Sequence, residues 1–337
     1  MTGSLKRGAA WALRRSGVLA ARERLRRGRI GIILMYHRVN DEADPFFPAL
    51  GVDAFESQLD YLRSTYRVEN LDGLLGWLRE GSPGPPRVAL TIDDGYADTH
   101  AVVLPRLKSR RLPATLFLAT DPPENGRLLW LDRLRLLLKH TPAEILDLPE
   151  HGLGPWRLAS TGQRLDSLGR IAGRLKRAGP AEVEDVVGAL WQRLDGDAIS
   201  SGPSPLSWTQ IRELQNGGVA IGGHTHRHYV LSQLGREAAR EEIATSLALI
   251  RERLGCEPSG FAYPNGEEGD YGAETIDVLR ELGVSWACCT LTGFATPEAP
   301  PHEIPRIYTS MDTASLFACR VAGLTRLRAS DGAARVA

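Results

Sequence analysis

The sequence predicts an α/β fold built on a parallel sheet, and two observations lead to this class. From residue 30 onward, short buried apolar runs alternate with stretches whose apolar residues recur at helical spacing. The polar residues with the most chemical potential follow directly after predicted strands, where reactive groups converge in parallel α/β proteins. A chain of 337 residues with 42% hydrophobic positions has enough apolar material for one large domain of this class, or for two modest ones.

The part of this pattern before residue 120 supplies three strands. Each is an apolar run with the length of a buried strand, and the helices between them carry apolar residues along one face. A Pro-Gly-Pro-Pro turn at 83–86 leads into the second strand. The predicted order is strand Ile30 to Tyr36, helix Phe55 to Tyr66, strand Arg87 to Ile92, helix 101–111 and strand Ala114 to Ala119.

Between residues 128 and 200 the pattern changes. The stretch from Leu128 to Asp197 has helical periodicity, is rich in Leu and Arg, and carries no strand signal. Prolines interrupt it at positions 142, 149, 155 and 180. We interpret 128–200 as a helical insertion and expect it to be a packing appendage. A lid that grips the substrate stays open as the alternative, because segments carried on a rigid scaffold often bind ligands.

After the insertion, the alternation of strands and helices resumes up to about residue 320. Ser207 is the expected N-cap of a helix that Gly217 and Gly218 end. We therefore predict a single domain over 30–320 and a C-terminal tail over 321–337. The remaining predicted elements are strand Val219 to Ile221, helix Arg236 to Leu254, strand Gly260 to Tyr263, helix Ala273 to Leu282 and a strand around Val284 to Cys289.

Composition argues against a nucleic-acid partner, because 41 basic and 41 acidic side chains cancel and leave no overall field that attracts a polyanion. The four cysteines have no paired spacing, which favours a reducing compartment. Residues 1–29 are rich in Arg and contain neither an apolar signal region nor a membrane span. We expect a helical or disordered leader that is solvated, with weak contact to an anionic membrane surface as the alternative, and a cytoplasmic location that includes the membrane face.

Two adjacent carboxylates mark the end of the second predicted strand. Neighbouring residues in a strand point to opposite faces, so Asp93 and Asp94 can serve one site only where the strand turns into its loop, as Gly95 indicates. One carboxylate can then ligate a cation while the other accepts a proton. Asp-Asp-Gly is also common in ordinary turns, so this segment alone does not establish a site.

The segment from His224 to His228 also follows a predicted strand. If the segment is helical, its two terminal histidines lie one turn apart and point the same way, and imidazole is the commonest metal ligand among side chains. Together with one of the aspartates they form a three-ligand zinc site that leaves a position open for water. His226 is out of phase with the pair, so we expect it to be a bystander or to support a ligand.

These two segments resemble motifs of the polysaccharide deacetylases, the carbohydrate esterase family with the NodB homology domain, over roughly residues 30–310. The family motif T-F-D-D-G is similar to Thr91 through Gly95, with Ile92 in place of Phe, and H-[ST]-x-x-H is matched by His224 through His228. The resemblance implies a distorted (β/α)7 barrel of the NodB type.

The same resemblance implies the roles of the four residues. Asp93 resembles the general base of the family. The ligands of zinc, or of another divalent transition metal, are then Asp94, His224 and His228.

Another family motif is altered in this chain. Ala262 through Gly266 reads A-Y-P-N-G where the family typically has R-P-P-Y-G, so Ala262 takes the place of the arginine. With Phe261 in front, the segment resembles the F-A-Y-P-x-G branch of bacterial exopolysaccharide deacetylases. The arginine that usually holds the catalytic aspartate is therefore missing. Arg306 is the expected replacement, with a surface or strand-end ion pair as the alternative. The backbone N–H of Asn265 aligns with the family's oxyanion donor, and a plain turn is the other interpretation.

The family's last motif, L-x-H, supplies the histidine that protonates the leaving group, and it is absent near the C-terminus. His302 lies in a Pro-rich loop and fits this role poorly. His37, at the end of the first strand, is the expected acid, because permuted relatives of this branch place the acid near the N-terminus. The first and last strands of a closed barrel are neighbours, so either can deliver a side chain to the same mouth. A strand-end residue that only forms hydrogen bonds is the alternative for His37.

The resemblance implies a hydrolase that removes acetyl groups from N-acetylated sugars of a polysaccharide or oligosaccharide and releases acetate. An N-acetylated glycan is then the expected partner. An O-acetyl sugar esterase and a small-amide hydrolase share the fold and the chemistry, so both stay open. The missing arginine and the missing histidine also leave open a glycan-binding domain without catalysis. The glycan, the identity of the metal and the oligomeric state are not indicated by the sequence.

Overall fold

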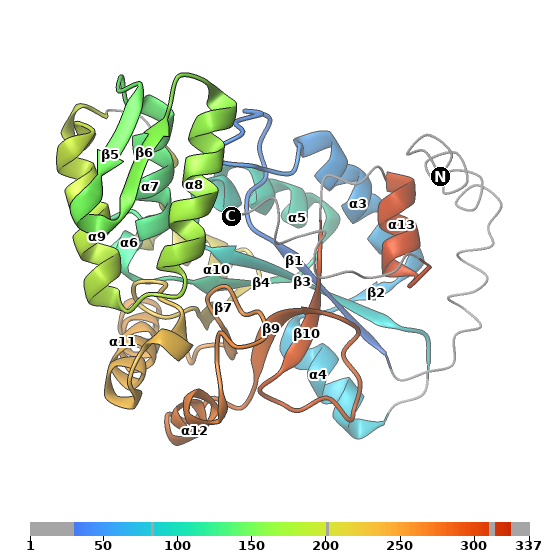
Figure 1. Cartoon of the computed structure of the whole chain (residues 1–337). Helices are drawn as coiled ribbons and strands as arrows, with labels where there is room; N and C mark the ends of the chain where they lie inside the picture. The colour runs from blue at the N-terminus through green and yellow to red at the C-terminus, as the bar shows by residue number, and fades with distance from the viewer. Residues whose placement is uncertain (1–29, 82–83, 200–201, 310–313, 325–337) are drawn as a thin grey trace.

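The computed structural model describes residues 30–81, 84–199, 202–309 and 314–324; the leader predicted over 1–29 and most of the predicted tail lie outside these ranges. Parallel strands close into a barrel in the order β1, β10, β9, β8, β7, β4, β3 and back to β1 (Figure 1). The α/β class and the seven-stranded barrel that the resemblance implied are both confirmed. The strands of the ring are β1 Gly31–Tyr36, β3 Arg87–Asp94, β4 Ala114–Leu118, β7 Val219–Gly223, β8 Phe261–Ala262, β9 Ala287–Thr292 and β10 Ile304–Tyr308.

The register between β1 and β3 fixes where the functional residues emerge. The two strands pair from Gly31 beside Arg87 to Tyr36 beside Ile92. Every residue of β1 is buried, because side chains fill the inside of the barrel and helices cover the outside. Tyr36 ends β1 beside Ile92, whereas β3 continues through Asp93 to Asp94. His37 and the two aspartates therefore lie at the same mouth of the barrel. A short strand, β2 Arg67–Val68, pairs with the first residues of β3 outside the ring.

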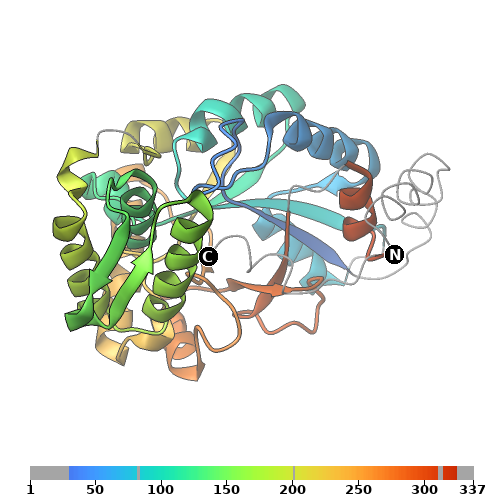
Figure 2. The same cartoon turned by 45° about the horizontal axis from the view of Figure 1, so that its top comes forward.

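Helices surround the strands, as the two views in Figure 1 and Figure 2 show. Ser207 caps α10 as predicted: its hydroxyl accepts a hydrogen bond from the Gln210 N–H, and the Gln210 side chain bonds back to the Ser207 backbone. The helices are α3 Val52–Thr65, α4 Leu71–Glu80, α5 Leu104–Arg110, α6 Asp121–Asn125, α10 Trp208–Asn216, α11 Arg236–Leu254, α12 Ala273–Glu281 and α13 Ala314–Val321.

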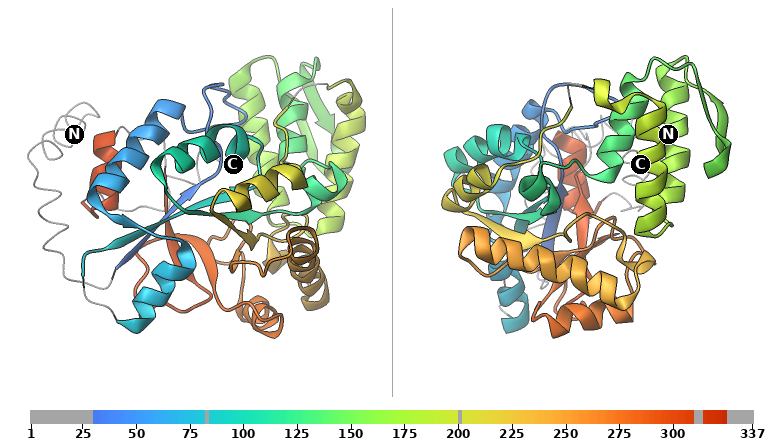
Figure 3. Two further views of the ribbon diagram at one scale, coloured as in Figure 1. Left: turned by 180° about the vertical axis from the view of Figure 1, so that it is seen from behind. Right: turned by 90° about the vertical axis from the view of Figure 1, so that its left-hand side faces the viewer.

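The insertion forms a lobe beside the barrel (Figure 2 and Figure 3). Its helices are α7 Trp130–His140, α8 Thr161–Leu175 and α9 Pro180–Arg193, and they enclose a hydrophobic core of their own that includes Leu134, Leu137, Leu168, Ile171 and Val186. This core is separate from those around the barrel strands, so the lobe is a compact unit packed onto the barrel.

The prediction that the insertion is purely helical is wrong, because an antiparallel hairpin lies between α7 and α8. Its strands are β5 Ile145–Leu148 and β6 Leu153–Arg157. The alternation of exposed and buried side chains along β5 covers only four residues, which is too short to stand out in a Leu-rich stretch. Pro149 and Pro155 were interpreted as helix breakers, and they lie in the turn of the hairpin and on β6.

Several smaller differences concern elements near the C-terminus. The strand expected around Val284 to Cys289 starts later, at Ala287. The sequence pattern did not predict β10, which proves to be the strand that completes the ring beside β1. Among the helices of the described ranges, none combines the length and the apolar character that crossing a membrane requires.

Candidate metal and catalytic site

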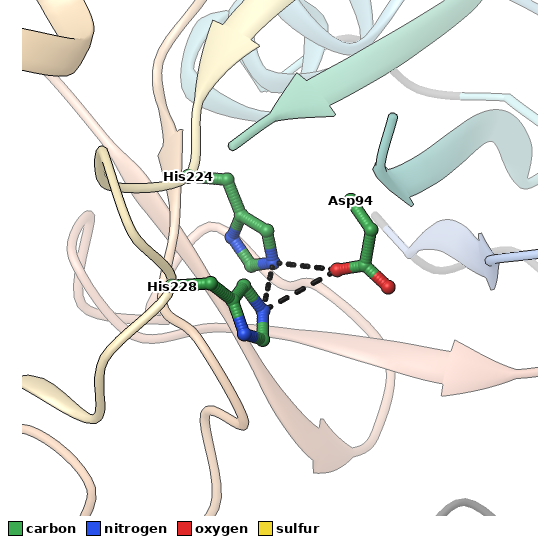
Figure 4. A group of neighbouring side chains, drawn as sticks. All are labelled: Asp94, His224 and His228. Carbon is green, nitrogen blue, oxygen red and sulfur yellow. Dashed lines mark hydrogen bonds and ion pairs between the residues drawn. The ribbon is translucent and has the colours of Figure 1, made fainter. Parts of the chain in front are cut away.

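Asp94, His224 and His228 converge at the mouth of the barrel (Figure 4). Asp94 Oδ1 lies 3.4 Å from His224 Nε2 and 3.3 Å from His228 Nε2, and the two Nε2 atoms are 3.1 Å apart. Zinc binds such ligands tetrahedrally at about 2.0–2.2 Å, which places ligand atoms roughly this far from one another. Within the described ranges, no other group of His, Cys, Asp and Glu converges in this way. One carboxylate and two imidazoles therefore fit zinc or a similar divalent metal.

The Asp94 ligand reaches the site from a strained turn at the end of β3. Its φ is 76°, in the left-handed region that costs a residue with a side chain about 1–3 kcal/mol. Gly95 follows with φ 102°, and a Cβ there would lie 2.7 Å from Leu118 Cδ1, so only glycine fits. This turn allows Asp93 and Asp94 to serve one site although they are adjacent on a strand.

The histidine segment is a loop, so the helical turn considered for residues 224–228 is not formed. Thr225 and His228 have φ of 62° and 63°, and the His228 N–H donates to Thr225 Oγ1 at 3.0 Å. The Glu242 carboxylate accepts from the N–H groups of His226 and Arg227. Side-chain oxygens thus accept hydrogen bonds from backbone N–H groups that would bond to carbonyls in a helix. The rings of His224 and His228 still lie close together, with centroids 4.7 Å apart.

Hydrogen bonds and charges around the ligands suit a cation. His224 Nδ1 bonds to the Ala262 carbonyl at 2.7 Å, which leaves Nε2 to face Asp94. Burial disfavours the Asp94 carboxylate, but hydrogen bonds from His224 and His228 outweigh it and hold its pKa well below the usual range. Burial also opposes the charge on His224, yet the contacts with Asp94 and Asp93 raise its pKa. For His228, burial prevails and lowers the pKa.

Arg306 forms a buried ion pair with Asp93 inside the barrel. Its Nη1 and Nη2 atoms each lie 2.8 Å from one oxygen of the carboxylate, the bidentate geometry that strengthens such pairs. Arg306 is 0% and Asp93 1% exposed, so this is not a surface pair. Burial works against ionisation of Asp93, but the charges of Arg306, His224 and His37 and the hydrogen bonds from Arg306 together outweigh it and lower the pKa. Arg306 is itself held by the Cys289 carbonyl and the Thr91 hydroxyl.

His37 and Asn265 both line one cavity at the mouth of the barrel. His37 is half-buried after β1, and its Nδ1 has no hydrogen-bond partner in the described part of the chain. It lies close enough that its charge lowers the pKa of both aspartates. Asn265 adopts φ 60°, its side chain donates to Asp270, and its carbonyl accepts from Thr290 Oγ1 at 2.8 Å. Neither contact involves its backbone N–H.

Asp94, His224 and His228 line a cavity of about 450 Å³ whose wall is formed by both the barrel and the insertion. Sequence reasoning did not find the insertion residues, because their side chains follow no periodic pattern that distinguishes a cavity wall from a core. It also missed Tyr96, which lines the cavity. Its position two residues after Asp94 could have indicated that it lies near the site. The insertion therefore does more than pack against the barrel. Its contributions to the wall are Leu129, Trp130, Leu131, Asp132, Arg135 and Lys176.

Two other histidines that the sequence drew attention to face away from this cavity. His226 contacts Thr120 Oγ1 at 3.0 Å through Nδ1 and Asp121 Oδ1 at 3.5 Å through Nε2. His302 is buried and contacts the Val284 carbonyl at 2.9 Å. Neither is positioned to join the metal ligands.

Comparison with solved structures gives the same architecture. Deacetylase PplD of Streptococcus pyogenes, solved in complex with acetate, is 17% identical with a TM-score of 0.60, over 87% of this chain and 98% of that one. IcaB of Ammonifex degensii is 22% identical with a TM-score of 0.58, over 88% and 98%. The BpsB deacetylase domain of Bordetella bronchiseptica is 18% identical with a TM-score of 0.52, over 84% and 96%. At these identities the likeness shows the fold alone.

No curated protein matches the sequence. The family described as polysaccharide deacetylase matches residues 80–153 and 168–287, which together make up more than half of the chain and include Asp93, Asp94, His224 and His228. The chain therefore belongs to the polysaccharide deacetylase family.

Proposed function

We propose that the protein is a metal-dependent deacetylase that removes acetyl groups from N-acetylated sugars of a polysaccharide or oligosaccharide and releases acetate. Membership of the family supports deacetylation. The observation that supports metal-dependent hydrolysis is the convergence of Asp94, His224 and His228 beside a buried Asp93 whose pKa is lowered. An ionised carboxylate next to an open metal position is what activation of water requires.

The proposed reaction is attack of water on the acetamido carbonyl. A zinc ion held by Asp94, His224 and His228 would polarise that carbonyl and lower the pKa of water toward about 7. Asp93 accepts the proton that the attacking water loses. Arg306 holds both oxygens of Asp93, so the base stays ionised and in a fixed orientation.

Two further residues handle the developing charges. The backbone N–H of Asn265 donates to the carbonyl oxygen as it becomes negative, a role that does not depend on the side chain at this position. His37 protonates the departing amine, because an amine anion is a very poor leaving group. The position of His37 in the cavity wall supports this assignment.

Acetate release from zinc-loaded protein tests the proposal, with N-acetylated and O-acetylated glycans offered side by side. We expect acetate and a free amino sugar from the N-acetylated glycan, loss of activity on chelation, and recovery with zinc. Release from the O-acetylated glycan alone would indicate an esterase, and binding without any release would indicate a domain that has lost catalysis. Full turnover by Asp93→Asn would show that the base is another group.

A further inference from the structure

Two of the three metal ligands have a strained backbone, and both belong to loops that are tied to the insertion. Asp94 and His228 have φ of 76° and 63°. Such conformations persist only where the surroundings fix them. A tyrosine follows each ligand, at positions 96 and 229. Both tyrosine hydroxyls donate hydrogen bonds to carboxylates of the insertion.

The first contact joins Tyr96 to Asp132 on α7. The hydroxyl lies 3.0 Å from each carboxylate oxygen, and Arg135 Nη1 lies 3.2 Å from Oδ1. Tyr96 is 6% and Asp132 is 2% exposed. A buried carboxylate depends on such donors, since water cannot replace them. The contact therefore holds the turn that carries Asp94 against α7.

The second contact joins Tyr229 to Glu184 on α9. The hydroxyl lies 2.9 Å from Glu184 Oε1, while Oε2 accepts from Arg133 at 3.0 Å and from Arg127 at 2.7 Å. The ring of Tyr229 is buried in the hydrophobic core of the insertion itself. The residue after His228 is thus anchored in the lobe, whereas His228 faces the metal site.

The third ligand is held in a different way. His224 directly follows β7, its φ is not positive, and its Nδ1 bonds to the Ala262 carbonyl on the neighbouring strand. The barrel orients this unstrained ligand. The two ligands with strained backbones are the ones that a tyrosine one or two residues further along ties to the insertion.

We propose that the insertion positions Asp94 and His228 for metal binding through two contacts, Tyr96 to Asp132 and Tyr229 to Glu184. All four are positioning residues, since they act through the ligand loops. The inference rests on the metal site of the proposed function. It implies that loss of either hydroxyl weakens metal binding although every ligand is retained.

Zinc affinity, measured by competition with a chromophoric chelator on the full chain, tests this. We expect Tyr96→Phe and Tyr229→Phe each to weaken zinc binding by roughly 10- to 100-fold, the range found for groups that support metal ligands. Tyr36→Phe is the matched control, because it removes a buried hydroxyl that donates to Gln58 Oε1 at 3.0 Å in the barrel core. An equal loss in Tyr36→Phe would overturn the proposal, since the effect would then be general destabilisation.

Two further measurements sharpen the test. Glu184→Gln keeps an acceptor for the Tyr229 hydroxyl, so it should weaken zinc binding less than Tyr229→Phe does. The double variant Glu184→Gln/Tyr229→Phe should lose no more zinc affinity than Tyr229→Phe alone, because both substitutions affect one contact. In metal-free protein, the amides of 95–97 and 225–229 should exchange hydrogen faster in the Phe variants than in the wild type. Unchanged zinc affinity and unchanged exchange in both Phe variants would overturn the proposal. A wild-type chain that binds no zinc would instead refute the metal centre, and the exchange rates would still decide whether the tyrosines fix the loops.

Discussion

Arg306 meets Asp93 from β10, whereas the family motif would supply the arginine at the position that Ala262 occupies on β8. The Asp93 carboxylate requires a guanidinium at a given place inside the barrel, but not from a given strand. An arginine on any strand can donate to both carboxylate oxygens if its side chain reaches the interior. A missing motif residue therefore does not mean a missing contact. This argues against the interpretation that the altered motif marks a domain without catalysis.

Replacing Arg306 tests whether the pairing serves catalysis. Lysine keeps the charge but cannot hold both oxygens, so we expect Arg306→Lys to lower kcat for acetate release by roughly 10- to 100-fold, with zinc content unchanged. Arg306→Ala should lower kcat further. Rates and metal analysis on the same preparations check this. Wild-type kcat in both variants would show that Asp93 works without the arginine.

The same ion pair makes a stability prediction. Removing one partner of a fully buried pair leaves the other charge uncompensated, so Arg306→Ala should lower the free energy of unfolding by about 3–5 kcal/mol. Urea unfolding monitored by circular dichroism measures this. The double variant Arg306→Met/Asp93→Leu removes both charges and should be more stable than Arg306→Ala. A loss below about 1 kcal/mol in Arg306→Ala would mean that the pair is weak.

His37 should matter more for amides than for esters. An amine must be protonated as it leaves, whereas an alkoxide is a better leaving group, so His37→Gln should lower kcat on an N-acetylated glycan by about 10²- to 10⁴-fold. The same variant should lose much less activity on an O-acetylated glycan. Parallel acetate assays give the comparison. Equal losses on the two substrates would assign His37 a structural role.

How well individual residues could be predicted depended on whether they lie in a local motif. The short segments at strand ends predicted a site of one aspartate with His224 and His228, the family resemblance chose Asp94, and the three side chains do converge. Tyr96 and Asp132 are far apart in sequence, and only the packing of the insertion brings them together. No periodicity encodes such a contact.

At the scale of elements, helices with a clear cap or a long periodic pattern could be predicted from the sequence, whereas short strands could not. The N-cap at Ser207 and the long helix α11 appear where the sequence predicts them. The β5–β6 hairpin was missed because short strands with prolines resemble breaks in a helix. The spacing of His224 and His228 would suit a helical turn, but Thr225 and Glu242 satisfy the backbone donors of this segment and it forms a loop instead.

The strand that delivers His224 passes unusually close to its neighbours. A Cβ on Gly222 of β7 would lie 2.6 Å from the Ser259 carbonyl oxygen and 2.8 Å from the Phe117 ring. Gly222→Ala should therefore cost about 1–3 kcal/mol of stability through overpacking, and weaken zinc binding by displacing His224. In contrast, Gly173 of α8 has nothing within 4 Å of an added Cβ, so Gly173→Ala should gain about 0.5–1 kcal/mol. Thermal unfolding and zinc titration of both variants check this, and an equally stable Gly222→Ala would contradict it.

At the scale of the whole molecule, the sequence predicted alternating strands and helices, and the family resemblance supplied the closed barrel. Closure depends on β1 pairing with both β3 and β10, contacts between distant segments that local pattern cannot specify. The local sequence pattern also could not predict that the insertion packs against the mouth of the barrel. Because the insertion packs there, Asp94, His224 and His228 lie where the loops after β3 and β7 contact it.

A metal held by Asp94, His224 and His228 would join two such loops, so its binding should stabilise the entire chain. A ligand that binds only the folded state adds RT ln(1 + [L]/Kd), which is about 2.7 kcal/mol at a free concentration 100 times Kd. We therefore expect the melting temperature to rise with zinc and to fall again with a chelator, as differential scanning calorimetry can measure. His228→Ala should abolish this rise. His226→Ala is the matched control and should keep it, because the His226 ring faces Thr120 and Asp121 rather than the ligands. If the melting temperature of the wild type did not depend on zinc, Asp94, His224 and His228 would have to be brought together for a reason other than a metal.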